Sequence, residues 1–295
     1  MRQPFVSILI VTWNRRDELL RSIDSALTQT YRNIEIVVID NCSSDGTAEM
    51  IACRYPRVRY IRLDRNVGCP SGRNIGFSHC QGKYIYQLDD DGWLKADAVE
   101  IAVQRAESDP TIAVVMSRIH EVEDGQVLRA LPAGQEAPAY QYSFIGCCSM
   151  IRRDAFARAG GYPEDFFRQA EEDDLALRLL EHGYFCFLEP ASIMYHAPSP
   201  IGRNLNVFLY YSLRNTNKTG LRLWPFPWCV LRPLVNFAHA CRYMVSRRYP
   251  ILLVCIWHEM LADLRALRGR RHPVSAKTFR LYRRLQKMPS LMRPA

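Results

Sequence analysis

The 295-residue sequence lacks several features that would place a protein in a class at once. Its ten cysteines include no CxxC pair and no spacing typical of a zinc site. The first residues, MRQP, lead directly into a strand-like run instead of an export signal. Scattered thiols without such a signal indicate a reducing compartment, so we expect small buried cysteines and no disulfide framework.

The sequence also lacks an apolar run long enough to span a bilayer, which needs about 20 apolar residues. Residues 223–235 are interrupted by prolines and an arginine, and the apolar run at 251–262 is shorter still. Acidic residues are scarce in the same region: residues 219–295 hold 15 Lys/Arg against only Glu259 and Asp263, whereas residues 1–218 hold 24 Lys/Arg against 28 Asp/Glu. The net charge of +9 therefore belongs to the tail, which we predict to be a basic, amphipathic helical extension that lies on a membrane surface.

The first half of the sequence alternates between strand-like and helix-like patterns. The predicted strands cover residues 5–12, 33–40, 58–64, 83–89 and 112–119, and the helices between them cover residues 17–28, 47–54, 72–80 and 95–108. Nearly continuous apolar strands that alternate with helices predict an α/β fold, with a mostly parallel sheet covered by helices on both faces. Ligands of such sheets bind beyond the carboxyl ends of the strands.

The second half has a different pattern. A polar stretch with Gly and Pro covers 121–138, and strand-like runs follow at 142–153 and 184–196. Between them a helix is predicted over 171–182, where Asp174 and Arg178 form an i,i+4 ion pair and Gly183 ends the helix.

Three adjacent carboxylates, Asp89, Asp90 and Asp91, follow the strand-like run KYIYQL. Like charges this close raise one another's pKa, so either the turn is solvated or a cation binds there. Mg²⁺ typically takes one or two carboxylates together with substrate phosphates. A helix-loop-helix calcium loop is excluded, because its alternate oxygen ligands and later bidentate glutamate are missing.

Three further features have both a plain structural and a functional interpretation. The acidic run EEDD at 171–174 complements a helix dipole, but four carboxylates exceed that need and include a candidate general base. His196 is either a core histidine or a metal ligand. Arg73 lies in the glycine-containing segment NVGCPSGRNIGF, a type of loop that can cradle phosphates.

Together these motifs resemble the inverting nucleotide-sugar glycosyltransferases of family 2, which have the Rossmann-like GT-A fold. The resemblance covers about residues 1–218 and rests on motifs that occur in the family's order: VSILIVTWNR, SALTQTYRNIEIVVIDNCSSDGT, NVGCPSGRNIGF, LDDDGW, GGYPEDFFRQAEEDDLALRLLEHGY, MYH and YYSLRN. It implies a nucleotide-sugar-binding half at 1–120, an acceptor-side half at 121–218 and a separate tail at 219–295.

The resemblance also implies roles for individual residues on the donor side. Thr12, Asn14 and Asp40 would contact the nucleotide base, Asp89 would hold the ribose, and Arg73 would lie near the nucleotide.

The metal site follows from the same resemblance. Asp91 would be the principal ligand of Mg²⁺ or Mn²⁺, His196 would lie beside the metal or the diphosphate, and Asp90 would lie between the two assigned aspartates in the nucleotide-sugar site.

The acceptor side departs from the family at one position. Where the family usually has Glu-Asp, this chain has Glu171-Glu172. The implied general base is therefore Glu172, and Asp173 is the alternative.

The predicted activity is a metal-dependent, inverting transfer of a sugar from a nucleoside-diphosphate sugar to a hydroxyl of a saccharide or lipid-linked saccharide. It would serve cell-surface polysaccharide or glycolipid synthesis, in the cytoplasm on the inner face of the membrane. A nucleotidyltransferase is one alternative, although EEDDLALR would have no role in that chemistry. The other is a degenerate relative acting as a basic membrane- or nucleic-acid-binding module; Trp, Leu and Ile interleaved with Arg favour lipid over nucleic acid.

Overall fold

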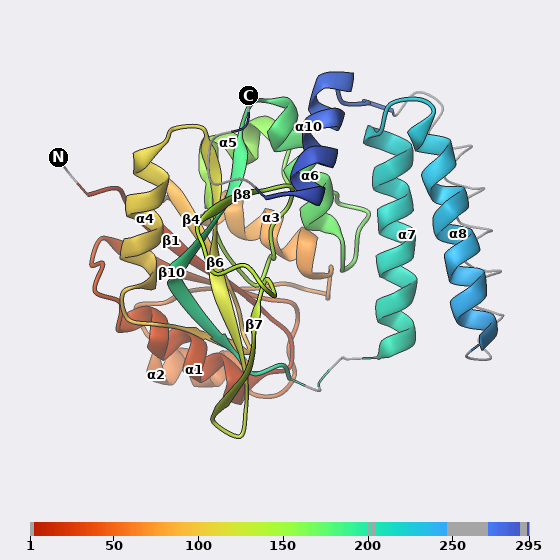
Figure 1. Cartoon of the computed structure of the whole chain (residues 1–295). Helices are drawn as coiled ribbons and strands as arrows, with labels where there is room; N and C mark the ends of the chain where they lie inside the picture. The colour runs from red at the N-terminus through yellow and green to blue at the C-terminus, as the bar shows by residue number, and fades with distance from the viewer. Residues whose placement is uncertain (1–2, 200, 202–203, 247–270, 290–293, 295) are drawn as a thin grey trace.

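The computed structural model describes residues 3–199, 201, 204–246, 271–289 and 294, and it is built around one ten-stranded sheet (Figure 1). The main path of the sheet has the strand order β3-β2-β1-β4-β9-β6-β10-β5, while β7 pairs with β6 and β8 pairs with β10. This architecture confirms the α/β class and the GT-A type of fold expected from the sequence.

The first four strands form the parallel part of the sheet. They are β3 (Arg59–Arg62), β2 (Ile34–Asp40), β1 (Val6–Thr12) and β4 (Tyr84–Asp89). Their connections are the helices α1 (Arg16–Leu27), α2 (Thr47–Arg54) and α3 (Cys69–His79). Helical crossovers of this length return the chain to the same edge, which makes neighbouring strands parallel.

The second half of the sheet is mixed. Its strands are β5 (Gly92–Leu94), β6 (Ile112–Glu123), β7 (Gln126–Leu131), β8 (Ala139–Gln141), β9 (Cys148–Arg152) and β10 (Phe185–His196). Strand β9 is antiparallel to both β4 and β6, whereas β10 runs parallel to β6. The mostly parallel arrangement expected from the sequence thus holds for the first four strands and for the β6–β10 pair, whereas β9, β5, β7 and β8 are antiparallel to their neighbours.

The polar stretch at 121–138 contains a short link between two antiparallel neighbours. The strand β6 continues to Glu123, and Asp124-Gly125, with φ of 50° and 79°, turns the chain into β7. Positive φ at both turn residues is typical of the two-residue hairpin, whose twist matches that of the strands.

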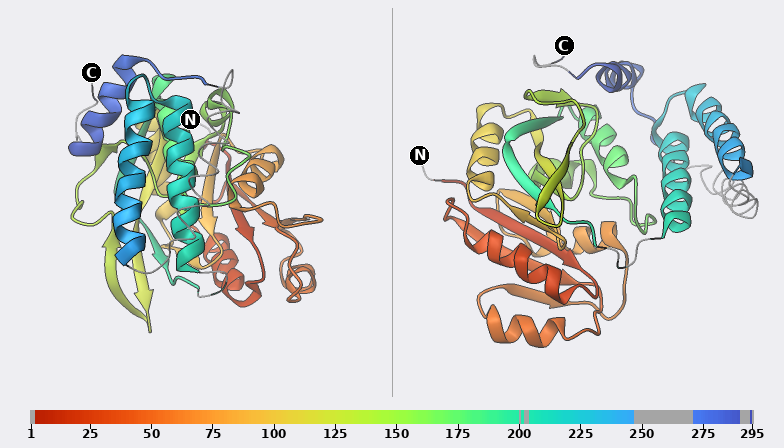
Figure 2. Two further views of the ribbon diagram at one scale, coloured as in Figure 1. Left: turned by 90° about the vertical axis from the view of Figure 1, so that its right-hand side faces the viewer. Right: turned by 60° about the horizontal axis from the view of Figure 1, so that its bottom comes forward.

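Helices cover both faces of the sheet (Figure 2). Alternate strand residues point to opposite faces and divide the buried side chains into two clusters. The helices α1, α2 and α4 (Ala98–Ser108) pack on one face, and α3, α5 (Arg153–Ala159) and α6 (Glu171–Glu181) contribute to the other. Within α6 the predicted ion pair is formed, with Arg178 Nε 2.8 Å from Asp174 Oδ1, and Gly183 follows the helix with φ of 78°.

In the part of the chain that the structure describes, three helices follow the last strand. They are α7 (Leu205–Leu223), α8 (Trp228–Ser246) and α10 (Ala276–Lys287). The helices α7 and α8 stand side by side, and α10 returns to the body of the molecule, where Phe279, Tyr282 and Leu285 are buried (Figure 1). Among the described residues, no helix is long and apolar enough to cross a membrane.

The predicted boundary at 218/219 lies inside α7. Lys218, Thr219 and Leu221 are all buried there. Helix α7 runs through this boundary without a break in its packing. The division into a catalytic body and a tail therefore stays a prediction about function. The apolar run at 251–262 lies outside the described residues.

Candidate active site

The candidate active site lies where the order of the parallel strands reverses. Strand β1 has β2 on one side and β4 on the other, and the register pairs Thr12 with Asp40 and Val11 with Asp89. The carboxyl ends of these three strands are therefore level. Such a reversal point is the usual ligand crevice of an open α/β sheet.

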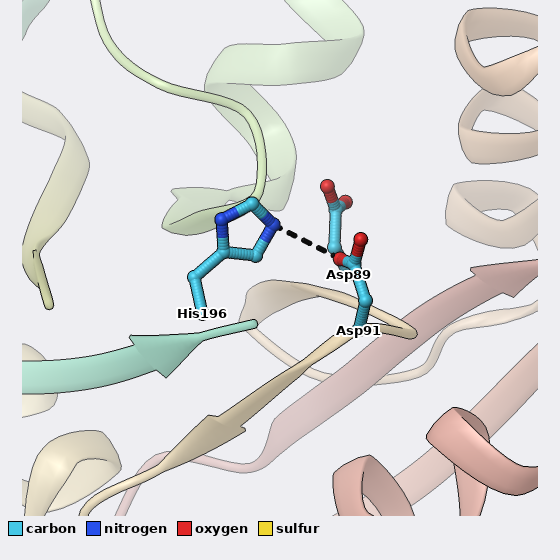
Figure 3. Close-up of side chains that lie close together, drawn as sticks. All are labelled: Asp89, Asp91 and His196. Carbon is cyan, nitrogen blue, oxygen red and sulfur yellow. Dashed lines mark hydrogen bonds and ion pairs between the residues drawn. The ribbon is translucent and has the colours of Figure 1, made fainter. Parts of the chain in front are cut away.

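Asp91 and His196 meet at this edge (Figure 3). His196 ends β10, opposite Gly92 of β5, and its Nε2 lies 3.0 Å from Asp91 Oδ1. The backbone N–H of Ser199 donates to the other oxygen of Asp91 at 3.0 Å. Burial opposes ionisation of Asp91, but the hydrogen bond from His196 and the charges of His196 and Arg15 outweigh it and lower the pKa of Asp91 to about 2.

Asp89 joins Asp91 and His196 in one cluster. Each of the three residues offers a ligand atom, and these atoms lie within 4.8 Å of one another (Figure 3). Two carboxylate oxygens and one imidazole nitrogen are suitable donors for a divalent cation. The structure thus brings the two predicted metal residues together and adds Asp89, to which the resemblance assigned the ribose.

Asp90 points into the protein, where the sequence provides an unexpected partner. Arg15 Nη1 lies 2.8 Å from Asp90 Oδ1 and 3.2 Å from Asp91 Oδ2. Asp90 is only 4% exposed, and burial raises the pKa of its carboxyl to about 7 against the opposing charge of Arg15. Arg15 is a site residue that the sequence reasoning missed; a cation directly after the loop of Thr12 and Asn14 was the available signal.

The acidic turn is fixed by small residues. The hydroxyl of Ser22 in α1 donates to the carbonyl of Asp90 at 2.8 Å. A Cβ on Gly92 would lie 1.9 Å from Met194 Cε and 3.2 Å from the carbonyl oxygen of Tyr195, so the end of the Met194 side chain fills the space beside this glycine.

The residues predicted to contact the base lie at the ends of β1 and β2. Asn14 links the two loops: its N–H donates to Ser43 Oγ and its Oδ1 accepts from Ser44 N–H, both at 2.8 Å. Thr12 is buried at the end of β1. Asp40 is fully buried, with its oxygens accepting from Ser43 N–H and Tyr60 Oη. These partners favour a role for Asp40 in shaping the turn, and its base contact stays a prediction.

Arg73 connects the acidic turn with the second acidic run. It lies inside α3 and not in a loop, it is 4% exposed, and its Nη2 donates to Asp89 Oδ1 at 3.0 Å. Its Nη1 lies 3.3 Å from Glu171 Oε1 and 3.7 Å from Glu172 Oε1. A buried guanidinium is stable only when paired, so these carboxylates hold Arg73 between the two halves of the site. Its predicted position near the nucleotide stays untested.

Glu172 and Asp173 face different surroundings. Glu172 Oε1 accepts from the N–H of Gly146 at 3.2 Å, and its side chain is 20% exposed. Asp173 lies near Tyr142 and Tyr282, whose pKa values are raised mainly by burial and further by the charge of Asp173. Tyr282 belongs to α10, so Asp173 points toward the C-terminal helix, while Glu172 points toward Arg73 and the acidic turn.

The surroundings of Glu172 favour proton uptake. Burial, followed by the charge of neighbouring Glu171, raises the pKa of Glu172 to about 8 against the opposing charge of Arg73. A carboxylate with raised proton affinity at the edge of a site is suited to remove a proton from a hydroxyl.

Comparison with known proteins agrees with this geometry. A sequence model of the family described as "Glycosyl transferase family 2" matches residues 7–160. The succinoglycan biosynthesis protein ExoO of Rhizobium meliloti is 38% identical over 106 residues, which cover 36% of this chain and 30% of that protein. The chondroitin synthase of Escherichia coli is 32% identical over 193 residues, which cover 62% of this chain and 28% of that protein. The chain thus spans less than a third of the length of either relative.

Other relatives and solved structures extend the likeness. The putative colanic acid biosynthesis glycosyl transferase WcaA of Escherichia coli is 28% identical over 204 residues, 65% of this chain and 72% of that protein. GalNAc-T7, solved with UDP, GalNAc and Mn²⁺, superposes with a TM-score of 0.63 at 20% identity over 76% of this chain and 49% of its own. Residues 1–349 of Staphylococcus aureus TarS, solved with UDP-GlcNAc, superpose with a TM-score of 0.61 at 15% identity over 74% of this chain and 66% of theirs.

At these identities the solved structures establish the fold alone. The family match is a separate observation: it covers more than half of the chain and contains the loop after β1, the acidic turn and Arg73. The chain therefore belongs to glycosyl transferase family 2.

Proposed function

We propose that this glycosyltransferase moves a sugar from a nucleoside-diphosphate sugar to a hydroxyl acceptor with inversion, and that it depends on a divalent cation. The observation that carries the proposal is the buried Arg73, which joins the Asp89–Asp91–His196 cluster to Glu172. A single displacement requires that the donor and the acceptor are held together. A metal-binding cluster and a general base that are joined by one buried side chain meet this requirement.

The donor set fits Mg²⁺ or Mn²⁺. The oxygens of Asp89 and Asp91 suit both ions, and His196 adds a nitrogen from a side chain that the end of β10 fixes. Asp91 would be the principal ligand, because its low pKa keeps it ionised. A bound cation would stabilise the negative charge that develops on the departing diphosphate.

The chain's own residues account for the remaining steps. Glu172 accepts the proton of the acceptor hydroxyl. At the same time the hydroxyl oxygen attacks the anomeric carbon from the face opposite the leaving group. Gly146 N–H holds Glu172 Oε1, which leaves Oε2 to take the proton. Arg73 fixes Asp89 and Glu172 relative to each other. Asp173 is the less favoured base, because it points toward α10.

The donor half of the site is proposed from the ends of the parallel strands. Thr12, Asn14 and Asp40 border the place of the nucleotide base, and Asp90 is held beside it by Arg15. Solved proteins of this fold hold UDP or UDP-GlcNAc, so we propose a UDP-sugar as the first donor to test. Relatives named for succinoglycan, chondroitin and colanic acid synthesis support a saccharide or lipid-linked saccharide acceptor in polysaccharide synthesis.

The basic tail supports a place on the inner face of a membrane. In α8 the side chains of Val230, Leu231, Leu234 and Val235 are each about 45% exposed and recur with helical spacing. An exposed apolar stripe in a region of 15 Lys/Arg and two acidic residues suits an anionic lipid surface. We therefore keep the assignment of catalysis to 1–218 and of membrane contact to 219–295.

A donor screen tests the proposed function. The full-length protein is incubated with UDP-, GDP- and dTDP-sugars with and without Mn²⁺, and the released nucleoside diphosphate is measured. We expect Mn²⁺-dependent release from one nucleotide class, faster when an oligosaccharide acceptor is added. Release that is unchanged by chelation contradicts the metal assignment, and nucleotide transfer to a sugar phosphate would support a nucleotidyltransferase instead.

A further inference from the structure

The backbone just before Glu172 is unusual. Gln169 and Ala170 both have positive φ, 66° and 63°, and neither is glycine. Residues with a Cβ rarely adopt this left-handed conformation, so surrounding contacts must hold two of them in succession. Ala170 is the residue that flanks the first turn of α6, and Glu172 is the second residue of that helix. The direction of the Glu172 side chain therefore depends on this left-handed pair.

One side chain of α7 binds this segment. Asn215 is fully buried, and its Nδ2 donates to the carbonyl oxygens of Arg168 and Gln169, both at 2.8 Å. A side-chain amide has two N–H hydrogens, so each carbonyl receives one. The amide oxygen of Asn215 accepts from Arg214 Nη1 at 2.9 Å. Both N–H hydrogens and the oxygen of the amide therefore have partners, and these partners fix its orientation.

We propose that Asn215 is a positioning residue for the general base. By holding two consecutive carbonyls it keeps Gln169 and Ala170 left-handed, and this conformation aims Glu172 at Gly146 and Arg73. The inference rests on the proposed role of Glu172 as base. This role gives α7 a function in the reaction, although α7 contributes no residue to the Asp89–Asp91–His196 cluster and does not contain Glu172.

The chemistry of the contact requires an amide. Alanine would leave the carbonyls of Arg168 and Gln169 without this donor. Aspartate has nearly the same shape, but it would bring a carboxylate oxygen against the same two carbonyls. Asn217, two residues later on α7, is also buried, yet its Oδ1 accepts from Asn236 of α8 at 3.0 Å. It is a matched control for loss of a buried amide in the same helix.

The first experiment separates turnover from donor binding. N215A, N215D and N217A are assayed in the full-length protein with the UDP-sugar that the wild type uses best. We expect kcat of N215A to fall about 10- to 100-fold with donor KM within about twofold, because a small misplacement of a catalytic group is costly in rate. N215D should be as slow as N215A or slower, and N217A should keep its kcat. Equal losses in N215A and N217A, or none in N215A, would overturn the proposal.

A second variant tests the backbone mechanism. Glycine adopts positive φ without steric cost, so A170G should keep the left-handed conformation at residue 170 with less help from Asn215. We expect the double variant N215A/A170G to recover roughly fivefold or more of the lost kcat. If the double variant is no faster than N215A, Asn215 does not act through this segment.

Hydrogen exchange provides a readout that needs no substrate. Backbone amides of residues 169–174 should exchange faster in N215A than in the wild type, and they should be unchanged in N217A. A wild type that transfers no sugar would refute the proposed function while leaving this comparison valid. Unchanged exchange in N215A, or faster exchange with unaltered kcat in an active enzyme, would refute the role of Asn215.

Discussion

At the scale of single residues, neighbouring carboxylates are divided by their surroundings. Glu172 meets a backbone donor and Arg73, whereas Asp173 lies near Tyr142 and near Tyr282 of α10. Asp90 is paired with Arg15, whereas Asp91 meets His196. Asp90 and Asp91 therefore differ in proton affinity, and Glu172 and Asp173 differ in the groups that surround them.

The first prediction concerns the identity of the base. Glu172→Gln keeps the shape and the contact with Gly146 but cannot take up a proton, so kcat should fall about 100-fold or more, within the range that general-base catalysis contributes. Initial-rate kinetics of sugar transfer, with donor KM measured alongside, check this. Asp173→Asn is the control; a larger loss there than in Glu172→Gln would move the base to Asp173.

The same residue makes a prediction about stability and pH. Since the folded protein raises the pKa of Glu172 to about 8, the protonated form is favoured. The stability from this group is complete below the ordinary glutamate pKa and is lost as pH rises through about 8. Glu172→Gln should therefore raise Tm at pH 8.5 by roughly 2–4 °C, which is the shift that a stability change of about 1 kcal/mol causes in domains somewhat smaller than this chain. At pH 4 the same substitution should leave Tm unchanged. Thermal unfolding of both proteins across this range checks it; a constant difference would contradict the pKa shift.

A third prediction concerns the cluster at the acidic turn. Asp91→Asn removes the ionised ligand but keeps the contact with Ser199, so Mn²⁺-dependent UDP binding should weaken at least about tenfold. Calorimetric titration with UDP, with and without Mn²⁺, measures this. Asp124→Asn changes an exposed carboxylate at the β6–β7 turn, where asparagine also tolerates positive φ, and should bind like the wild type. Undiminished metal dependence in Asp91→Asn would exclude Asp91 as the principal ligand.

At the scale of elements, the site is assembled from segments far apart in the sequence. The loop before β9 brings Gly146 between Arg73 of α3 and Glu172 of α6, where its carbonyl accepts from Arg73 Nη2 at 3.0 Å. Side chains of α10 cover the far side of α6. Glu172, the proposed base, is thus enclosed by elements that no single motif contains.

The fourth prediction follows from this crowding. A Cβ at Gly146 would lie 2.3 Å from Glu172 Oε1 and 2.5 Å from Arg73 Nη1. Gly146→Ala should therefore displace the base and lower kcat about 10- to 100-fold, with little effect on UDP binding. Gly220→Ala in α7 is the control, since the nearest atoms would lie 3.8 Å from its new Cβ. Equal kinetics in both variants would mean that Arg73 and Glu172 adjust without loss.

Much of the element pattern was readable from the sequence. The strands ending at Thr12, Asp40 and Asp89 were predicted because buried parallel strands are continuously apolar. The β6–β7 hairpin was missed, since its exposed strand lacks that pattern, and Arg73 was assigned to a loop although it lies within α3. Arg15 was missed because its partners are about 75 residues away, and local patterns do not report such contacts.

At the scale of the whole molecule, the C-terminal region is shared between two tasks. Helix α10 and the second half of α7 pack on the catalytic body, whereas α8 presents its apolar stripe outward. The predicted tail is therefore partly a structural support of the acceptor side.

The fifth prediction tests the outward face. Leu234→Asp places a charge in the α8 stripe and should reduce co-sedimentation with anionic phospholipid vesicles at least about threefold without changing kcat. Leu128→Asp alters a leucine on the β7 hairpin that is exposed even further, 63% against 48%, and should sediment like the wild type. Equal sedimentation of both variants would remove α8 from membrane contact, and binding to DNA but not to vesicles would favour a nucleic-acid partner.

The sequence by itself determined the α/β class and the family, and it predicted the candidate carboxylates of the site, because apolar periodicity and short motifs are local properties. The tertiary structure alone decided which carboxylate faces which partner: Glu172 toward Arg73, Asp173 toward α10, and Asp90 toward Arg15. These assignments depend on burial and on charges brought together by distant segments, and both arise only when the chain folds.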